Sequence, residues 1–337
     1  MLQRRYFKNK IFNLASHEEF ENVAIDLFYY QAENNPIYKN YLENLGKPSV
    51  FNRVKSKKIS QLEEIPFLPI SSFKTHVVIN KGLSTEKEFT SSGTGSSGFS
   101  SHHVHDLTLY ESSFKKGFDI FYPNSKDYCF LALLPNYLER EGSSLIYMAQ
   151  QLIANSSDKD SGFYLDDLEG LAEVLLKKQK QGKKFILLGV TYALLDLAKS
   201  FPQNLSDGII METGGMKGRR KEMLREEVHL ILKNAFNIEK VHSEYGMTEL
   251  LSQAYSKGDG KFVCPPWMKI LVRETTDPFH IVKEGKAGGI NCIDLANIDS
   301  CAFIETQDLG RKIAENEFEI LGRFDNSEIR GCNLMVF

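Results

Sequence analysis

Apolar side chains recur at helical spacing in the N-terminal part of the chain. One face of a predicted helix carries Phe20, Val23, Leu27 and Tyr30. Ser16 precedes the acidic residues Glu18 and Glu19, an order typical of a helix N-cap. The pattern predicts a helical packing layer at the start of the fold.

The pattern changes in the middle of the chain. Two prolines in EEIPFLPISSFKTHVV forbid a regular helix, so we expect an extended segment there. Farther along, the helical pattern DLTLYESSFKKGFDI is followed by the short apolar runs YCFLALL, KFILLGV and DGIIME, each with a loop or helix after it. Strands alternating with helices predict an α/β fold, with a largely parallel sheet covered by helices on both faces.

The C-terminal third is richer in short strand-like runs. KFVCPPWMKILVRE, GGINCIDLA and CAFIETQDL are separated by Gly, Pro, Asp and Asn turn signals. We expect these strands to form a second sheet or small barrel joined to the first lobe. The predicted organisation is therefore a helical layer over residues 1–65, an α/β core over 66–255 and a β-rich subdomain over 256–337.

Composition narrows the class of protein. The sequence is 42% hydrophobic and 25% charged, as in soluble enzymes, and its formal net charge is −3. The net charge of the protein therefore does not favour binding to nucleic acid or to an anionic membrane. The basic N-terminus is not followed by an apolar stretch long enough for a signal peptide or a membrane span, so we expect a cytoplasmic protein.

The cysteines show no CxxC spacing, so they predict neither a zinc site nor a disulfide framework. They are Cys129, Cys264, Cys292, Cys301 and Cys332. Most are expected to be buried small apolar residues.

A Gly/Ser/Thr-rich stretch at residues 90–98, TSSGTGSSG, is the first candidate for chemistry. Its glycines allow backbone N–H groups to approach an anion, and its hydroxyls add donors, so it suits a polyphosphate. It is not a Walker A loop, because Phe99 follows Gly98 in place of Lys-Ser/Thr. Alone, it is equally consistent with a flexible Gly/Ser loop.

A second candidate is residues 243–249, SEYGMTE, after the β-like run IEKVHS. It combines an aromatic ring, a hydroxyl and a carboxylate within a few residues. These groups fit a base that stacks, phosphates that need donors and Mg²⁺ that needs oxygen ligands.

Together, the two segments resemble the phosphate loop and the Y-G-x-T-E motif of the adenylate-forming superfamily. Three further stretches fall in the order in which that family has its motifs. Thr213-Gly214-Gly215 resembles the glycine turn beside the adenine, and Thr306-Gln307-Asp308-Leu309-Gly310 resembles the motif whose Asp holds the ribose. Gly322-Arg323-Phe324-Asp325 resembles the hinge motif G-R-x-D. The resemblance implies the N-terminal-type fold of these enzymes, with mostly parallel sheets covered by helices and a small β-rich C-terminal part.

The segments IPFLPISSFK and GRFDNSEIRGCNLM are similar to the acyl-protein synthetases of the LuxE type. That resemblance covers nearly the whole chain. It implies that ATP activates a fatty acid as acyl-AMP and that the acyl group moves to a thiol. Cys332 occupies the place of the family's acyl-carrying cysteine.

The same resemblance implies roles for individual residues. Those implied to bind ATP are Ser91, Ser92, Gly93, Thr94 and Gly95 at the phosphates, Gly214 and Gly215 at the adenine, and Tyr245, Gly246, Met247, Thr248, Asp308 and Arg323. Glu249 is the implied Mg²⁺ ligand, and the implied catalytic residues are Thr248, Arg323 and Cys332.

Two departures from the wider superfamily matter. The phosphate loop has Gly95-Ser96 where Thr-Gly is usual, and its usual basic residue is missing. The chain ends at Phe337, so we expect no large swinging C-terminal domain and no catalytic lysine from it. This favours an acyl-protein synthetase over an acyl- or aryl-CoA ligase. A nucleotide-binding subunit without activity is the third alternative.

The resemblance implies the partners as well. They are a carboxylic acid and an acyl acceptor, which is either coenzyme A or a protein such as a reductase, a transferase or an acyl carrier protein.

Three histidines lie close together in the sequence, at His102, His103 and His105. Such a cluster could bind a metal ion, but no carboxylate or cysteine pattern of a zinc site accompanies it. We expect these histidines on a strand or loop beside the phosphate site.

Overall fold

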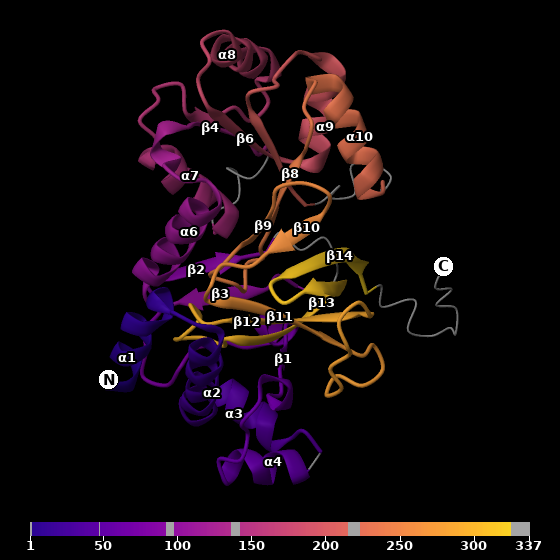
Figure 1. The fold of residues 1–337 in the computed structure, drawn as a ribbon. Helices are drawn as coiled ribbons and strands as arrows, with labels where there is room; N and C mark the ends of the chain where they lie inside the picture. The colour runs from indigo at the N-terminus through magenta and orange to yellow at the C-terminus, as the bar shows by residue number, and fades with distance from the viewer. Residues whose placement is uncertain (1, 47, 92–97, 136–141, 215–222, 325–337) are drawn as a thin grey trace.

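Helices form the N-terminal layer of the protein. The computed structural model describes residues 2–46, 48–91, 98–135, 142–214 and 223–324 (Figure 1). The layer consists of α1 (Leu2–Lys10), α2 (His17–Asn34), α3 (Pro36–Glu43) and α4 (Pro48–Lys55), with 3-10 turns at Ile11–Asn13 and Leu62–Glu64. The predicted cap is confirmed, since the Ser16 hydroxyl accepts a hydrogen bond from the Glu19 N–H at 3.1 Å.

Parallel strands form one half of the main sheet. Their spatial order is β5 (Gly162–Phe163), β4 (Cys129–Leu133), β6 (Phe185–Val190), β7 (Ile209–Thr213) and β8 (His242–Tyr245). Every residue of β4 and β6 is buried, which explains their unbroken apolar runs. The prediction of an α/β fold is confirmed.

Helices cover this half on both sides. They are α6 (Leu107–Phe121), α7 (Ser144–Asn155), α8 (Leu168–Lys180), α9 (Thr191–Ser200) and α10 (Arg225–Phe236). Figure 1 shows α6 and α7 on one side of the parallel strands and α9 and α10 on the other.

The C-terminal strands continue the same sheet. They are β9 (Ala254–Ser256), β10 (Lys261–Val263), β11 (Met268–Arg273), β12 (Ala287–Asp294), β13 (Phe303–Ala314) and β14 (Glu317–Arg323). From β8 the order runs antiparallel through β9, β10, β14, β13 and β12 to β11. A short strand off this path, β1 (Leu68–Pro69), pairs in parallel with β13 and completes the twelve-stranded sheet.

The expectation of a second sheet or small barrel is therefore wrong, although these strands are joined to the first part of the fold, as expected. The reason is that β9 pairs with the free edge of β8 and links the two halves. The predicted domain limits at residues 65 and 255 remain a prediction, and the sheet runs across the second of them, inside β9.

Four short elements lie in sequence between the N-terminal layer and the parallel half of the sheet. The predicted extended segment is extended at β1, but a short helix, α5 (Ser72–Thr75), follows its second proline. The strands β2 (Lys87–Thr90) and β3 (Ser101–Val104) form an antiparallel hairpin. In sequence they are connected by the Gly/Ser/Thr-rich stretch at residues 90–98, called the glycine-rich loop below.

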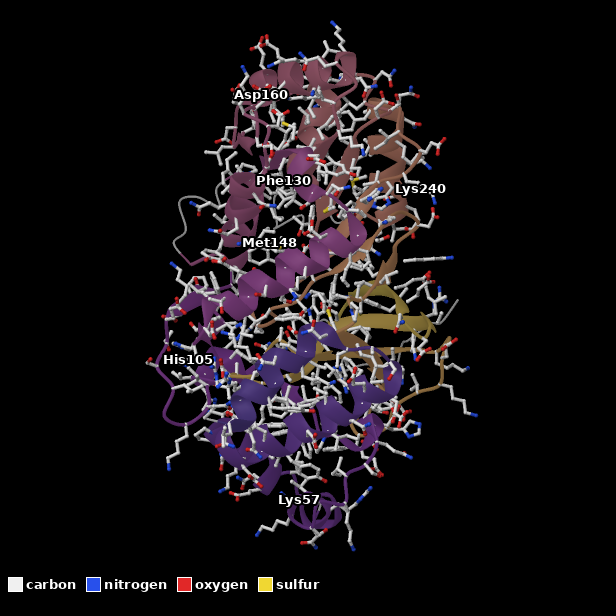
Figure 2. All side chains as sticks on the ribbon, turned by 60° about the vertical axis from the view of Figure 1, so that its left-hand side comes forward. Lys57, His105, Phe130, Met148, Asp160 and Lys240 are labelled. Carbon is white, nitrogen blue, oxygen red and sulfur yellow. The ribbon has the colours of Figure 1, made fainter. Side chains whose placement is uncertain are left out.

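Aromatic packing fixes the N-terminal layer on the antiparallel half. The rings of Phe28 and Tyr38 lie 5.9 and 6.3 Å from the ring of Phe303 on β13. Figure 2 shows Phe130 of β4 inside the molecule, while Lys57 and Lys240 lie at its outside. Over the described ranges, no helix has the length and apolar character to cross a membrane.

Candidate active site

The candidate site begins where β7 and β8 end. Thr213 pairs with Glu244 in the parallel register, so the turns at Gly214 and Gly246 leave the sheet at the same edge. Ligands of open α/β sheets bind at this edge. A Cβ atom at Gly246 would lie 2.4 Å from Glu244 Oε1, so any larger residue would displace that carboxyl group.

Asp308 is the centre of a polar cluster on the antiparallel side. The Tyr245 hydroxyl donates to Asp308 Oδ2 at 2.8 Å, and Arg323 Nε donates to Oδ1 at 3.1 Å. Asp308 and Arg323 are also paired in the register of β13 and β14. The Tyr245 ring is held edge-on by Phe262 and Phe318. Burial and the nearby Asp308 raise the pKa of Tyr245, so its phenol remains a donor.

Glu249 lies close to the same cluster. It is only 5% exposed, and burial raises the pKa of its carboxyl group. A hydrogen bond from Ser100 and the charge of Arg323 partly oppose that rise, whereas the charge of Asp308 adds to it. Motifs that lie far apart in sequence therefore bring Glu249, Asp308 and Arg323 within electrostatic reach of each other.

Buried polar side chains hold the backbone around Glu249. Asn297 Nδ2 donates to the Glu249 carbonyl at 2.8 Å. The fully buried carboxylate of Asp294 accepts the N–H groups of Leu251 and Ser252 at 2.7 and 3.0 Å. The sequence analysis missed Asn297 and Asp294, because neither belongs to a recognisable local pattern.

As expected, the three histidines lie on a strand or loop, with His102 and His103 on β3 and His105 directly after it. His102 is buried, and its Nδ1 lies 2.9 Å from the Thr248 carbonyl. His103 points to Thr85 and Glu88, and His105 Nδ1 bonds the Ser84 carbonyl at 2.6 Å. The histidines thus have separate partners.

Part of the predicted site lies outside the described residues. This applies to Ser92, Gly93, Thr94, Gly95, Gly215 and Cys332. At the base of the glycine-rich loop, the Ser91 hydroxyl accepts the Ser100 N–H at 2.9 Å, and the Ser91 N–H donates to the Ser100 carbonyl at 2.9 Å. Ser91, Met247 and Thr248 are half-buried, and Gly214 is exposed.

Two buried carboxyl groups, Glu212 and Glu244, lie beneath the glycine turns, and the sequence motifs implied a role for neither. Glu212 accepts hydrogen bonds from the Thr191 and Ser243 hydroxyls at 2.9 and 3.0 Å. Burial would raise its pKa, but His229 and Arg225 lower it. Glu244 accepts from Thr213 at 2.5 Å, and burial raises its pKa to about 7.

Replacing Glu244 by glutamine should remove a pH dependence of stability. Because the folded-state pKa is about 7 and the ordinary value is 4.5, the native carboxyl group holds its proton more tightly. Wild-type stability should fall as the pH rises through this window, whereas Glu244→Gln should not show that fall. Urea unfolding should show the variant gaining about 2–3 kcal/mol on the wild type between pH 5 and pH 8. A gap that does not change with pH would contradict this assignment.

The residues present fit a magnesium–nucleotide complex. Among the described residues, no group of three or more His, Cys, Asp and Glu side chains could hold a metal ion. Mg²⁺ bound to a nucleotide does not need such a group, since one or two carboxylates and the phosphates supply its oxygen ligands. Glu249, a buried carboxylate beside Asp308 and Arg323, meets that requirement.

The described cysteines do not resemble activated nucleophiles. All four are free thiols. Burial raises the pKa of Cys129 to about 11 and that of Cys301 to about 12, and it raises those of Cys264 and Cys292 as well. Such thiols are poor sources of thiolate.

The fold is shared with solved structures of a CoA ligase and of an ATP-bound protein, MatB. An open conformation of 2-hydroxyisobutyryl-CoA ligase in complex with 2-HIB-AMP and CoA superposes with a TM-score of 0.65 and 12% identity, over 92% of this chain and 70% of that chain. ATP-bound MatB from Rhodopseudomonas palustris gives a TM-score of 0.53 and 15% identity, over 70% of this chain. The match covers 47% of MatB, so the chain spans about half of that protein.

The family follows from the sequence match, because structural likeness at such low identity shows only the fold. A comparison with curated proteins finds no match. The family described as "Acyl-protein synthetase, LuxE" matches residues 21–337. Since that match spans nearly the whole chain, the protein belongs to the LuxE acyl-protein synthetase family.

Proposed function

We propose that this protein activates a carboxylic acid with ATP as an acyl-adenylate and passes the acyl group to a thiol. The observation that carries the proposal is the cluster of Tyr245, Asp308 and Arg323 beside the buried Glu249. It provides a carboxylate acceptor, a cation and a candidate metal ligand at the edge where α/β sheets bind ligands.

In the first half-reaction, a carboxylate oxygen of the acid attacks the α-phosphorus of ATP. The bond from the α-phosphorus to the bridging oxygen breaks, and pyrophosphate leaves with that electron pair. The protein has to position the reactants and offset the developing charge. In the proposal, Thr248 contacts the α-phosphate, and Ser91 to Gly95 donate to the remaining phosphates.

The nucleotide would be held from two sides. Asp308 accepts the ribose hydroxyls, and its carboxylate is oriented by Tyr245 and Arg323. Gly214 and Gly215 would line the adenine pocket, and Gly246 and Met247 would also contact the nucleotide. Glu249 would hold Mg²⁺, which offsets negative charge on the phosphates.

In the second half-reaction, a thiolate attacks the acyl carbon. The bond from that carbon to the phosphate oxygen breaks, and AMP leaves. Cys332 is the proposed acyl carrier, and the raised pKa values of the four described cysteines support a thiol outside that set. The final acceptor would be a partner protein such as a reductase, a transferase or an acyl carrier protein.

Cys332→Ala should separate the two half-reactions. With a fatty acid, the wild type should exchange labelled pyrophosphate into ATP and form a hydroxylamine-labile acyl adduct. The variant should lose the adduct completely, while exchange stays within about twofold, because the thiol acts only after adenylation. An adduct that persists in the variant would exclude Cys332 as the carrier. No exchange with any fatty or aromatic acid would contradict the proposed function itself.

A second candidate is an acid–CoA ligase, because the 2-hydroxyisobutyryl-CoA ligase that shares this fold is in complex with CoA. Thioester formation on added CoA, unchanged in Cys332→Ala, would select this alternative. Dependence on Cys332 would select the acyl-protein synthetase.

A further inference from the structure

We infer that His102 and Asn297 are positioning residues that fix the Thr248–Glu249 peptide for the magnesium–nucleotide complex. The inference rests on the proposed function, because it concerns the same segment. His102 follows the glycine-rich loop on β3, and Asn297 lies between β12 and β13. Each binds one of two successive backbone carbonyls, those of Thr248 and Glu249.

His102 reaches the first carbonyl from the hairpin that carries the phosphate loop. It is 1% exposed, and Phe73 packs edge-on against its ring, with the centroids 5.6 Å apart. A backbone carbonyl can only accept, so the nitrogen 2.9 Å from the Thr248 oxygen must carry a hydrogen. This contact selects the Nδ1-protonated tautomer of the neutral ring. Burial keeps the ring neutral by lowering its pKa to about 4.

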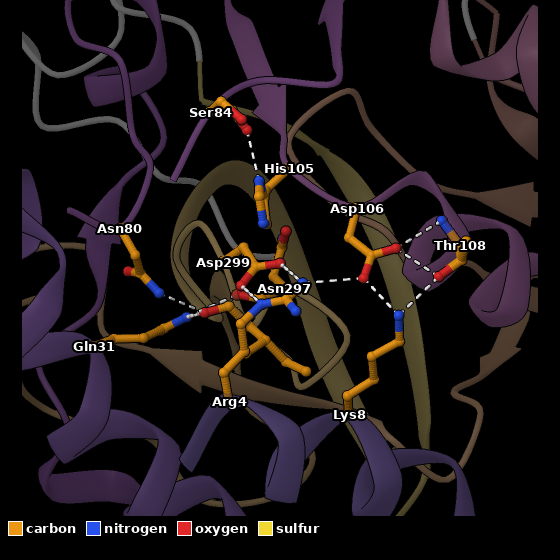
Figure 3. A network of polar contacts seen from close by, with 11 residues as sticks. Arg4, Lys8, Gln31, Asn80, Ser84, His105, Asp106, Thr108, Asn297 and Asp299 are labelled. Carbon is orange, nitrogen blue, oxygen red and sulfur yellow. Dashed lines mark hydrogen bonds and ion pairs between the residues drawn. The ribbon is translucent and has the colours of Figure 1, made fainter. Parts of the chain in front are cut away.

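Asn297 reaches the second carbonyl from a loop that the N-terminal layer holds in place. Gln31 of α2 donates to the carbonyls of Asn297 and Ile298 at 2.7 and 3.0 Å, and Asn80 donates to that of Ile298 at 2.9 Å. The neighbouring Asp299 is bound by Arg4 of α1 (Figure 3). Asn297 is therefore supported by segments far from it in sequence.

The consequence concerns the Glu249 side chain. A desolvated carboxylate stays in one orientation only if its backbone cannot rotate away. With both flanking carbonyls held, the direction of the Glu249 Cα–Cβ bond is fixed, and the Thr248 backbone is held with it. His102 also links strand β3 to this segment, so Mg²⁺ and the phosphates would meet a Thr248–Glu249 backbone that is already in place.

A matched pair of variants tests the inference. In His102→Asn, the amide nitrogen lies near the former Nδ1 position and can still donate, whereas His102→Leu removes the donor. Calorimetry gives the Kd for ATP with and without Mg²⁺, and the ratio measures the contribution of magnesium. We expect His102→Leu to lose about tenfold in this ratio and His102→Asn to stay within about threefold of the wild type. His103→Leu, one residue along the same strand, is the control and should leave the ratio unchanged.

Several outcomes would overturn the inference. One is an unchanged ratio in a folded His102→Leu, and another is an equal loss in both His102 variants. If the leucine variant does not fold, ¹⁵N spectra of wild-type histidines, with His102 assigned through His102→Asn, decide the question. A neutral ring protonated at Nε2 would then exclude the contact. Failure of the wild type to bind ATP would instead contradict the proposed function.

Discussion

Replacing Glu249 by glutamine is expected to lower pyrophosphate exchange by about 100-fold without lowering the stability of the fold. The change removes one charge and keeps the shape of the side chain. Exchange should fall because the proposed metal ligand loses its negative charge. Stability should be unchanged or higher at pH 8, because burial raises the pKa of this carboxyl group and its ionised form is therefore disfavoured in the folded protein.

The sign of the stability effect follows from the direction of that shift. A carboxyl group with a raised folded-state pKa stabilises the native state below its ordinary pKa, and that stabilisation is lost as the pH rises. Glutamine stays neutral throughout, so the variant should gain on the wild type as the pH increases. Steady-state exchange and urea unfolding at pH 6 and pH 8 measure the two effects separately.

Glu305→Gln is the matched control for Glu249→Gln. Glu305 lies on β13, its pKa is also raised by burial, and its carboxyl group is 3.5 Å from Arg273. We expect this variant to exchange pyrophosphate within about threefold of the wild type. If Glu249→Gln behaved in the same way, Glu249 would not be the metal ligand.

Local sequence signals predicted the elements, because each depends on residues close together in the chain. The N-cap at Ser16 required only the residues that follow it. The apolar runs at β4, β6 and β7 reflect burial between helices. The course of the sheet was not predictable in this way, because edge pairing between β8 and β9 leaves no periodic signal.

The candidate site was likewise predictable only in part, because its motif residues leave a local signal and its supporting residues do not. The ordered motifs pointed to Tyr245, Glu249, Asp308 and Arg323, and the fold brings these residues together although Tyr245 and Asp308 are 63 positions apart. The supporting contacts of His102 and Asn297 cross 146 and 48 positions. Single buried polar residues at such separations have no motif, so only the structure identifies their partners.

The second large effect is expected from Asp308→Ala, which should raise the Kd for ATP by about 30-fold. Asp308 is 7% exposed and already oriented by Tyr245 and Arg323, so its oxygens are fixed before the nucleotide arrives. A 30-fold change is about 2 kcal/mol, the net contribution of about one hydrogen bond to a charged acceptor, because water solvates the freed ribose hydroxyls in the variant. Calorimetric titration with ATP measures it, with Glu305→Gln again as the control.

A nucleotide that lacks the ribose hydroxyls identifies what Asp308 contacts. The wild type should bind 2′,3′-dideoxy-ATP about 30-fold more weakly than ATP, because the partners of the carboxylate are missing. Asp308→Ala should bind both nucleotides equally, since each change removes the same interaction and the two effects cannot add. If the losses do add, Asp308 acts on another part of the site. Tyr245→Phe should bind ATP more weakly than the wild type, but by less than Asp308→Ala does. It should bind the dideoxy nucleotide as well as the wild type does, because the Tyr245 hydroxyl acts only by orienting Asp308.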